Sequence, residues 1–264
     1  MVHLKTAEEI QIMRESASIL AKTHGEVARL IKPGVKTRTL DKKAEEFIRD
    51  NEGIPSFLNY NGFPASLCIS VNETVVHGFP GEYELKETDI VTIDCGVKFK
   101  GYHSDAAYTY PLEGVRSEVL DLLNRTYDSL YKGIEQAKAG NRIGDVSNAI
   151  QSYVEQFGYG VVRELVGHGV GKSLHEDPEV PNYGKRGKGP KIVPGMVFAI
   201  EPMINMGTKQ VVQERDGWTI RTSDRKPSAH FEHTVAIHED RTEVLTTHED
   251  IEKNYSYKWR SKSR

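Results

Sequence analysis

Two aspartates that stand eleven residues apart could share one chemical task. Asp94 lies in DIVTIDCGV, where apolar and polar residues alternate as they do in a half-buried β-strand. Asp105 follows in YHSDAAY, after the polar turn 98–101. If that turn centres between Phe99 and Lys100, the two carboxylates lie directly opposite each other on one face of a hairpin, with Cβ atoms about 5 Å apart. A shared proton or a divalent cation would relieve their repulsion, whereas a misplaced turn would leave an ordinary surface pair.

Three further residues have types that favour the cation. His168 lies between glycines in GHGVG, where backbone can come close to a ligand or a neighbouring strand. Glu201 ends the apolar stretch MVFAI, and Glu232 lies inside the strand-like segment AHFEHTVAI. Taken alone, a histidine in a glycine-rich loop is usually structural, and a buried glutamate is more often salt-bridged than bound to a metal.

Taken together, the five side chains form an oxygen-rich set with one imidazole. The four carboxylates carry a formal charge of −4, which two divalent ions with bridging carboxylates balance and one ion does not. Such a set suits Mn, Fe, Co or Zn better than it suits a structural zinc, which favours Cys and His. Two ions about 3.5–4 Å apart can bind both an attacking water and a scissile carbonyl. The residues therefore indicate metal-assisted hydrolysis of an amide or a phosphate ester.

Composition excludes several other classes of protein. The formal net charge of −3 argues against a broad surface for nucleic acid. Cys68 and Cys95 are the only cysteines, which excludes a disulfide scaffold and a four-cysteine zinc site and favours a reduced compartment. The N-terminal MVHLKTAEEIQ has charged residues where a signal peptide needs an apolar stretch, and nothing approaches the roughly 20 apolar residues of a membrane span. We therefore expect a cytoplasmic protein.

Helical patterns come in two pairs along the chain. Thr6 and Glu9 form a capping-box pattern at the start of a long helix that Pro33 and Gly34 end. A shorter amphipathic helix follows, and the same plan recurs with a helical pattern over 116–138 and another amphipathic helix after it. The residues expected to face the core are Met13, Ala17, Leu20, Val27 and Ile31 in the first helix, Leu40, Ala44, Phe47 and Ile48 in the second, and Val146, Ile150, Tyr153 and Val154 in the last.

The two helix pairs are related by an offset of 106 residues, at which Gly34 matches Gly140. Strand-like segments follow each pair, so we expect a single domain of two related α+β halves that share one sheet, roughly 6–115 and 116–250. The strand candidates are 67–71, 89–97, 102–110, 161–166, 196–206, 210–222 with a turn at Asp216–Gly217, 229–237 and 242–246. The tail 251–264 is expected to be solvated and partly disordered. Its basic residues are Lys253, Lys258, Arg260, Lys262 and Arg264.

Five motifs of this sequence resemble, in order and spacing, those of the methionine aminopeptidases of the pita-bread fold. The motifs are NETVVHG, IDCGVKFKGYHSDAAYT, GHGVGKSLHEDPEVPNYG, VFAIEPM and FEHTVAI. The resemblance runs from the first helix to about residue 247, and the five motifs together are specific where any one alone would be weak. It implies an α+β pita-bread fold, in which two pseudo-symmetric halves share a curved antiparallel sheet with the helices outside.

The resemblance also implies a metal-binding role for each of the five candidate ligands. Asp94 would bind one ion, and Asp105 and Glu232 would bridge two ions. His168 and Glu201 would complete the coordination of the second ion. A water molecule that bridges the two divalent ions would attack the scissile carbonyl, and Glu201 would move its proton.

Two histidines and an apolar pocket would handle the substrate. The resemblance implies that His77 contacts the substrate near its scissile amide and leaving nitrogen, and that His175 hydrogen-bonds the carbonyl and the developing oxyanion. Without the resemblance, plain core packing would explain the pocket aromatics equally well. Leu174 departs from many bacterial members, which carry an aromatic residue there, so the shape of the pocket is open. The implied residues of the pocket for the methionine side chain are Tyr60, Phe63, Cys68, Leu174 and Trp218, with Cys68 as a wall rather than a nucleophile.

Missing features favour the type I subclass. Type II members carry an insertion of several tens of residues between the positions of His168 and Glu201 or close to it, whereas the interval here is 33 residues. The Cys/His-rich N-terminal extension of many eukaryotic type I members is absent. The expected activity is co-translational removal of the initiator methionine from proteins with small second residues. The expected partners are nascent polypeptides and, transiently, the ribosome, with no membrane and no specific nucleic-acid sequence.

Two alternative functions are compatible with the same fold. One is a metal-dependent aminopeptidase with another preference, such as Xaa-Pro, which the absence of a large extra N-terminal domain disfavours. The other is a pita-bread protein that binds partners without catalysis, which the intact set of ligands and histidines disfavours. Cleavage of a Met-Ala-X peptide with and without a chelator distinguishes them.

Overall fold

The first helix starts as the sequence predicts but ends earlier. The computed structural model describes residues 1–260 of the chain. Helix α1 spans Ala7–Ala28, and its capping box is closed, because the Glu9 N–H donates to the Thr6 hydroxyl (3.3 Å) and the Thr6 N–H donates to the Glu9 carboxylate (2.9 Å). The helix ends at Ala28 rather than at Pro33, and Ile31 enters the core from the loop that follows.

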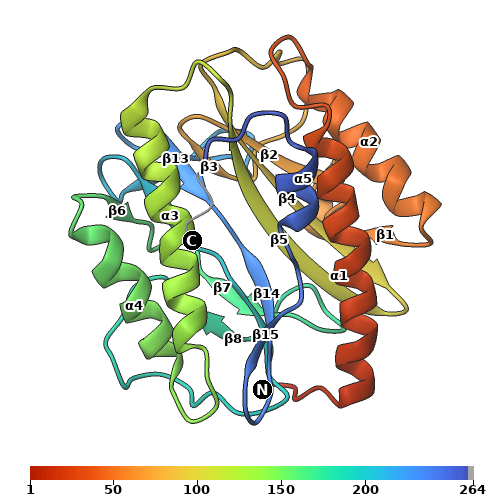
Figure 1. Cartoon of the computed structure of the whole chain (residues 1–264), viewed down its shortest axis with the longest axis vertical. Helices are drawn as coiled ribbons and strands as arrows, with labels where there is room; N and C mark the ends of the chain where they lie inside the picture. Colours follow the sequence, from red (N-terminus) through yellow and green to blue (C-terminus); the bar gives the residue numbers. More distant parts are fainter. Residues whose placement is uncertain (261–264) are drawn as a thin grey trace.

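Two helix pairs flank the strands, as predicted. Helix α2 (Thr37–Asp50) follows α1, and α3 (Ser117–Gln136) is followed by α4 (Ile143–Glu155). Helix α4 starts 106 residues after α2, and the glycines ahead of the two helices, Gly34 and Gly140, both have a positive φ (84° and 96°). Figure 1 shows α1 and α2 at the right of the view and α3 and α4 at the left, with β14 between the two pairs. The two helix pairs and their offset of 106 residues are therefore confirmed, whereas the division into related halves at 6–115 and 116–250 stays a prediction.

The strands are short except for one long hairpin. Strands β4 (Ile90–Phe99) and β5 (Tyr102–Pro111) form this hairpin, which both predicted ranges anticipate within two residues. The other strands are β1 (Ile54–Pro55), β2 (Leu67–Val71), β3 (Thr74–Val76), β6 (Gly160–Val161), β7 (Gly167–Gly169), β8 (Glu176–Val180), β9 (Val197–Ile200), β10 (Met203–Asn205), β11 (Val211–Gln213), β12 (Ile220–Thr222), β13 (Ser228–His230), β14 (His233–Ile237) and β15 (Thr242–Val244), and a 3-10 turn spans Tyr60–Gly62.

The strands pair antiparallel and, over residues 1–260, form four hydrogen-bonded sheets. The first has the order β1-β4-β2 with β5 beside β4, and the largest has the order β15-β14-β9-β7-β8. These two sheets meet where the Glu232 N–H donates to the Ala107 carbonyl (3.0 Å) and the Thr234 hydroxyl donates to the Asp105 carbonyl (2.7 Å). The junction holds β5 beside the chain that enters β14.

Three predicted strands are each broken into two. The segment 210–222 breaks at the predicted Asp216–Gly217 turn into β11 and β12. The segment 196–206 breaks at Glu201–Pro202, and 229–237 breaks at Phe231–Glu232. Proline has no N–H to donate to a neighbouring strand, which explains the break at Pro202. Both glutamates therefore lie where a strand stops pairing, and their carboxylates can turn toward a common point.

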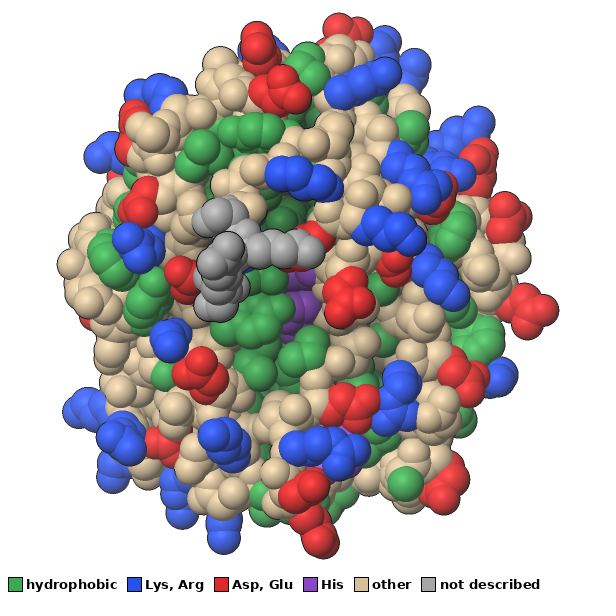
Figure 2. Space-filling view, in the orientation of Figure 1, with side chains coloured by type: hydrophobic (Ala, Val, Ile, Leu, Met, Phe, Trp, Pro, Cys, Tyr) green, Lys and Arg blue, Asp and Glu red, His purple; other side chains and the backbone are tan. Residues whose placement is uncertain are grey.

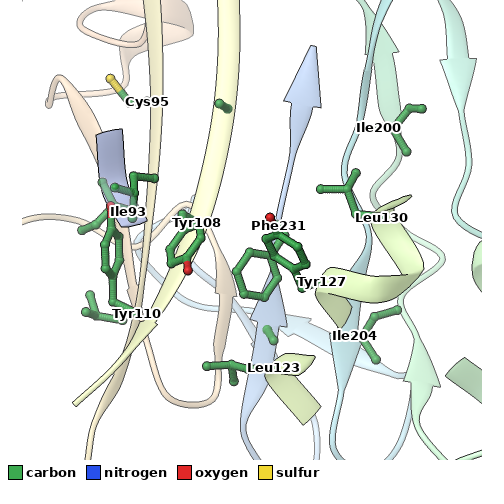
Figure 3. Close-up of a cluster of buried hydrophobic side chains, with 14 of the residues drawn as sticks. Ile93, Cys95, Tyr108, Tyr110, Leu123, Tyr127, Leu130, Ile200, Ile204 and Phe231 are labelled. Atoms are coloured by element: carbon green, nitrogen blue, oxygen red, sulfur yellow. The ribbon is translucent and has the colours of Figure 1, made fainter. Parts of the chain in front are cut away.

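The core lies between the long hairpin and the helices. Figure 3 shows apolar side chains of β4 and β5 facing those of α3, with Phe231 between them. The ring of Tyr108 meets that of Phe231 edge-on at 5.1 Å, and the ring of Tyr127 from α3 does the same at 5.3 Å. This packing fixes the outer face of the strands whose inner face carries the candidate ligands.

The prediction of a solvated C-terminal tail is wrong for residues 251–260. Helix α5 (Glu249–Asn254) lies against α1, and Ile251 and Tyr255 are buried. Arg260 stacks its guanidinium 3.5 Å above the centre of the Tyr127 ring and donates to Asp128 at 3.1 Å. The tail packs because apolar and aromatic side chains alternate with its lysines. The predicted residues Lys262 and Arg264 lie outside the described residues.

The surface mixes charges of both signs. Figure 2 shows acidic and basic side chains interspersed over the face that carries α5, around a hollow with apolar side chains in its floor. Within residues 1–260, no helix is both long enough and apolar enough to cross a membrane.

Candidate metal centre

Asp94 and Asp105 lie on one face of the hairpin, but not directly opposite each other. Phe99 pairs with Tyr102, so the turn centres between Lys100 and Gly101, one position later than expected. Asp94 therefore faces Ala107, and Asp105 faces Gly96. The prediction of directly opposed carboxylates is wrong by two residues, and the two are diagonal neighbours. Because side chains alternate with a period of two, this shift keeps both on the same face.

The turn explains the error. Lys100 and Gly101 both have a positive φ, 47° and 88°, as the central residues of a two-residue hairpin turn of the mirror-image type require. Glycine takes this conformation without strain, so the Lys-Gly pair marks the turn centre in the sequence. The longer polar stretch 98–101 hid that signal.

His168 lies in β7, between glycines that let three strands approach closely. A Cβ on Gly167 would lie 2.4 Å from the Ala199 carbonyl oxygen, and one on Gly169 would lie 2.2 Å from the Asp177 carbonyl oxygen. The glycines thus allow close approach to neighbouring strands, as the sequence predicted. The Nδ1–H of His168 donates to the Gly169 carbonyl at 3.0 Å. Its other nitrogen, Nε2, then carries a lone pair and faces the carboxylates.

The four acids and His168 converge on one point. The Nε2 atom of His168 lies 3.6 Å from Glu201 Oε1 and 3.8 Å from Asp105 Oδ2. Ligand atoms of Asp105, His168 and Glu232 all lie within 4.8 Å of one another, and all three residues are buried. Asp94 and Glu201 are half-buried at the edge of the same group.

Electrostatics in this group is unfavourable without a cation. Burial raises the pKa of Asp94, and burial followed by the charges of Glu232 and Asp94 raises the pKa of Asp105. The pKa values of Glu201 and Glu232 are raised by burial first and then by the neighbouring carboxylates. Burial also lowers the pKa of His168 to about 3, so the imidazole is neutral and forms no salt bridge with these acids.

The donor set fits a bound metal ion. Asp94 Oδ1, Asp105 Oδ1 and Glu232 Oε1 are buried and have no hydrogen-bond partner among residues 1–260. Each such atom costs about 1–3 kcal/mol if nothing satisfies it, and more when it is charged. A neutral imidazole lone pair and several carboxylate oxygens around one point are the ligands that Mn, Fe, Co and Zn accept. A divalent cation would satisfy these atoms and remove the repulsion together.

A cavity of about 420 Å³ opens over the acidic group. This volume is in the range of sites for small ligands. Every site residue predicted from the sequence lines it: Tyr60, Phe63, Cys68, His77, Asp94, Asp105, His168, Leu174, His175, Glu201, Trp218 and Glu232.

One wall of the cavity is apolar. Phe63 meets the Trp218 ring edge-on at 5.3 Å and stacks on Phe79 at the same distance. Leu174 is only 1% exposed and packs in the same cluster as Cys68. Burial raises the pKa of the Cys68 thiol well above its ordinary value, so the thiol is a wall element rather than a nucleophile. The wall suits an unbranched apolar side chain.

The two predicted substrate histidines flank the acids. His77 has a positive φ of 59°, an uncommon backbone conformation for a residue with a side chain, and its ring lies 6.4 Å from that of Trp218. The ring of His175 lies 4.0 Å from that of His168, and its Nδ1 is 2.8 Å from the Tyr60 phenol oxygen. Burial lowers the pKa of both His77 and His175, so both are neutral donors near pH 7.

Sequence reasoning missed several residues of the site. Four apolar residues, Val76, Leu165, Val166 and Met203, together with Phe57 and Asn61, also line the cavity. They lie in short strands and loops, where an apolar residue on a cavity wall has the same sequence pattern as one in the core. His230, buried beside Glu201, was also missed, although it stands two residues before Glu232 in AHFEHTVAI, and a histidine so close to a candidate ligand was a usable signal.

The chain is similar in sequence and structure to known metallopeptidases, in agreement with the metal-binding character of this site. Residues 11–239 match metallopeptidase family M24. The chain is 52% identical to methionine aminopeptidase 1 of Bacillus subtilis and 53% identical to a methionine aminopeptidase of Clostridium perfringens, each over 93% of this chain and 99% of the relative. A crystal structure of a methionine aminopeptidase from Thermotoga maritima superposes with a TM-score of 0.92 at 42% identity, covering 94% of this chain and 100% of that one.

These matches confirm the pita-bread class of fold and a metal-dependent peptidase. Family membership also agrees with the fit of the acidic group to a divalent metal. The chain therefore belongs to metallopeptidase family M24 and, within it, to the methionine aminopeptidases.

Proposed function

We propose that this chain is a single catalytic domain, a type I methionine aminopeptidase that removes the N-terminal methionine from peptides and proteins. The observation that carries the proposal is the composition of one cavity, where four carboxylates and an imidazole lie beside an apolar wall. The identity of about half of all residues with the methionine aminopeptidases of two bacteria supports the choice of substrate.

Five side chains would hold two divalent ions, Co, Mn, Fe or Zn. Asp94 is proposed to bind one ion, and Asp105 and Glu232 are proposed to bind both. His168 and Glu201 are proposed to complete the coordination of the second ion. When bound, the ions would polarise the scissile carbonyl and lower the pKa of the attacking water. The three buried carboxylate oxygens without partners support this assignment.

Three side chains would then manage protons and charge. Glu201 is proposed to accept the proton of the attacking water, since one carboxylate oxygen can bind a cation while the other takes a proton. His175 would donate a hydrogen bond to the carbonyl oxygen as negative charge develops there. His77 would contact the leaving nitrogen. Because both imidazoles are neutral, each carries one N–H for this purpose.

The apolar wall would hold the methionine side chain. Phe63 and Trp218 offer ring edges and faces to a thioether, and sulfur–aromatic contacts are worth about 0.3–1.5 kcal/mol each. Tyr60, Cys68 and Leu174 would complete the pocket. The cavity of about 420 Å³ is larger than one such side chain, so its volume does not limit the second residue. The preference for small second residues is proposed because a narrow cleft over the metal site would exclude bulk next to the scissile bond.

The substrates would be nascent polypeptides with a free N-terminal methionine. Removal during synthesis implies a transient contact with the ribosome and a cytoplasmic location. Two cysteines that are free and buried agree with a reducing compartment.

The proposal is tested with a panel of peptides. The metal-loaded protein should release methionine from Met-Ala-X, cleave Met-Leu-X far more slowly, and leave N-formyl-Met-Ala-X intact. Comparable rates on Met-Ala-X and Met-Leu-X would contradict the preference for small second residues. Faster cleavage of Xaa-Pro peptides would favour the other aminopeptidase activity. Cleavage of none of them by metal-loaded protein would favour a binding module.

A further inference from the structure

His230 is a fully buried histidine with two unsatisfied ring nitrogens. It is 1% exposed, and neither Nδ1 nor Nε2 has a hydrogen-bond partner among residues 1–260. Buried polar groups are hydrogen-bonded in the great majority of cases, so this one calls for an explanation. A neutral imidazole carries one ring N–H that can donate a hydrogen bond and one ring nitrogen that can accept one.

The backbone of His230 is held firmly in place. The residue ends β13 and pairs with Met203 of β10. Its N–H donates to the Thr109 hydroxyl at 3.0 Å, and that hydroxyl donates to the His230 carbonyl at 2.7 Å. Two strands and one side chain therefore fix the backbone position from which the imidazole extends.

The imidazole points at the free side of Glu201. His230 Nε2 lies 3.7 Å from Glu201 Oε2, while His168 Nε2 lies 3.6 Å from Glu201 Oε1. Each oxygen of the carboxylate thus faces a different imidazole. The Oε1 side faces the proposed co-ligand His168, and the Oε2 side faces away from it toward His230. A separation of 3.7 Å is too long for a hydrogen bond and short enough for a small movement to make one.

We propose that His230 is a positioning residue that donates its Nε2–H to Oε2 of Glu201 and so holds Oε1 toward the metal. The inference rests on the proposed role of Glu201 as a ligand. Outer hydrogen-bond partners of this kind orient ligating carboxylates, and their loss typically weakens metal binding or activity about 10–100-fold.

The variants that test this role differ in their ability to donate a hydrogen bond to Glu201. His230→Leu removes the donor, and His230→Gln keeps an amide N–H that can reach the same carboxylate. His248→Leu is the matched control, because His248 is also a buried histidine, yet it does not line the cavity. All three are compared with wild type by calorimetric titration of the metal-free protein with Mn²⁺.

Metal affinity gives the first readout. We expect His230→Leu to weaken Mn²⁺ binding about 10–100-fold, His230→Gln to stay within about threefold of wild type, and His248→Leu to stay within about twofold. Equal affinity of His230→Leu and wild type, or an equal loss in His248→Leu, would overturn the positioning role. Failure of wild type to bind Mn²⁺ or to cleave Met-Ala-X would instead overturn the proposed function, and the inference with it.

A crystal structure of the wild-type protein with Mn²⁺ gives a readout that does not depend on how the variants fold. The expected result is a separation of about 2.7–3.2 Å between His230 Nε2 and Glu201 Oε2. A separation that stays beyond about 3.5 Å would contradict the proposal. A bond of about 2.0–2.2 Å from His230 to the ion would also contradict it, since His230 would then be a ligand.

Discussion

The phenol oxygen of Tyr60 lies 2.8 Å from Nδ1 of His175. Burial, and then the charge of Asp105, raise the pKa of Tyr60, so its hydroxyl stays protonated near pH 7. Burial lowers the pKa of His175, so that imidazole is neutral. If the phenol donates to Nδ1, the proton of His175 lies on Nε2, which is the tautomer that the proposed hydrogen bond to the substrate carbonyl requires. We therefore propose that Tyr60 is a positioning residue for His175.

Removing only this hydroxyl should slow the reaction without weakening substrate binding. In Tyr60→Phe the ring that lines the pocket stays, so KM for Met-Ala-X should change less than about twofold. The rate constant kcat should fall about 3–10-fold, the value of one hydrogen bond of about 0.5–1.5 kcal/mol. Tyr102→Phe is the control, because its hydroxyl donates to Glu9 outside the cavity. An unchanged kcat, or a change confined to KM, would remove the positioning role of Tyr60.

His175→Ala should have a larger effect on turnover than Tyr60→Phe. We expect kcat to fall about a hundredfold or more, as for the loss of one oxyanion donor. Metal content, measured by elemental analysis of the same sample, should match wild type, because His175 is not in the proposed ligand set. Loss of metal from this variant would place His175 among the ligands.

Leu174→Phe should sharpen selectivity at modest cost. Leu174 packs in the pocket wall, so a ring there takes up room and adds a face for sulfur. Turnover of methionine peptides should stay within about tenfold of wild type, since volume changes in apolar pockets cost about 1–3 kcal/mol. Preference for methionine over the longer analogue ethionine should rise. Equal selectivity in wild type and variant, measured as kcat/KM for both side chains, would mean that Leu174 does not contact the substrate.

The metal-free protein should be stabilised by Asp94→Asn, increasingly so at high pH. Burial raises the folded-state pKa of Asp94 above its ordinary value of 3.8, so the folded state holds this proton more tightly than the unfolded state does. The contribution of Asp94 to stability is therefore largest at low pH and is lost as pH rises from about 4 toward its raised pKa. At pH 8 the variant should be more stable than wild type by roughly 1–3 kcal/mol.

Urea unfolding of both metal-free proteins from pH 5 to pH 8 measures this difference. Comparing two proteins that differ at one site cancels the opposite trend from the buried neutral histidines. The advantage of Asp94→Asn should shrink toward pH 5. A constant advantage across that range would mean that the charge of Asp94 is not what destabilises the metal-free site.

The sequence predicted the ligands better than their geometry. Residue types, taken together with the family resemblance, predicted Asp94, Asp105 and His168 as candidate ligands, and the structure places all three on one cavity. The register of the hairpin depended on which two residues form its turn, and the Lys100–Gly101 choice came from backbone conformation. Because the error was an even number of residues, the shared face survived it.

Local sequence patterns could not predict contacts between residues that are far apart in the chain. His230 faces Glu201 only because β13 and β10 pair, which relates residues far apart in the chain. The C-terminal residues Tyr255 and Arg260 read as part of a basic tail, yet Tyr255 is buried and Arg260 finds an aromatic ring on α3. Local charge density concealed the apolar residues between the lysines.

The most direct test of metal-dependent methionine removal is the rate of methionine release from Met-Ala-Ser as metal is added back to chelator-treated protein. We predict no release without metal, recovery of the rate with Mn²⁺ or Co²⁺, and less than about one hundredth of that rate in Asp105→Asn at the same metal concentration. Asp105→Asn should remain folded by circular dichroism, because the change keeps the shape of the side chain. Release at the full rate in the presence of chelator, or full activity of folded Asp105→Asn, would contradict the account.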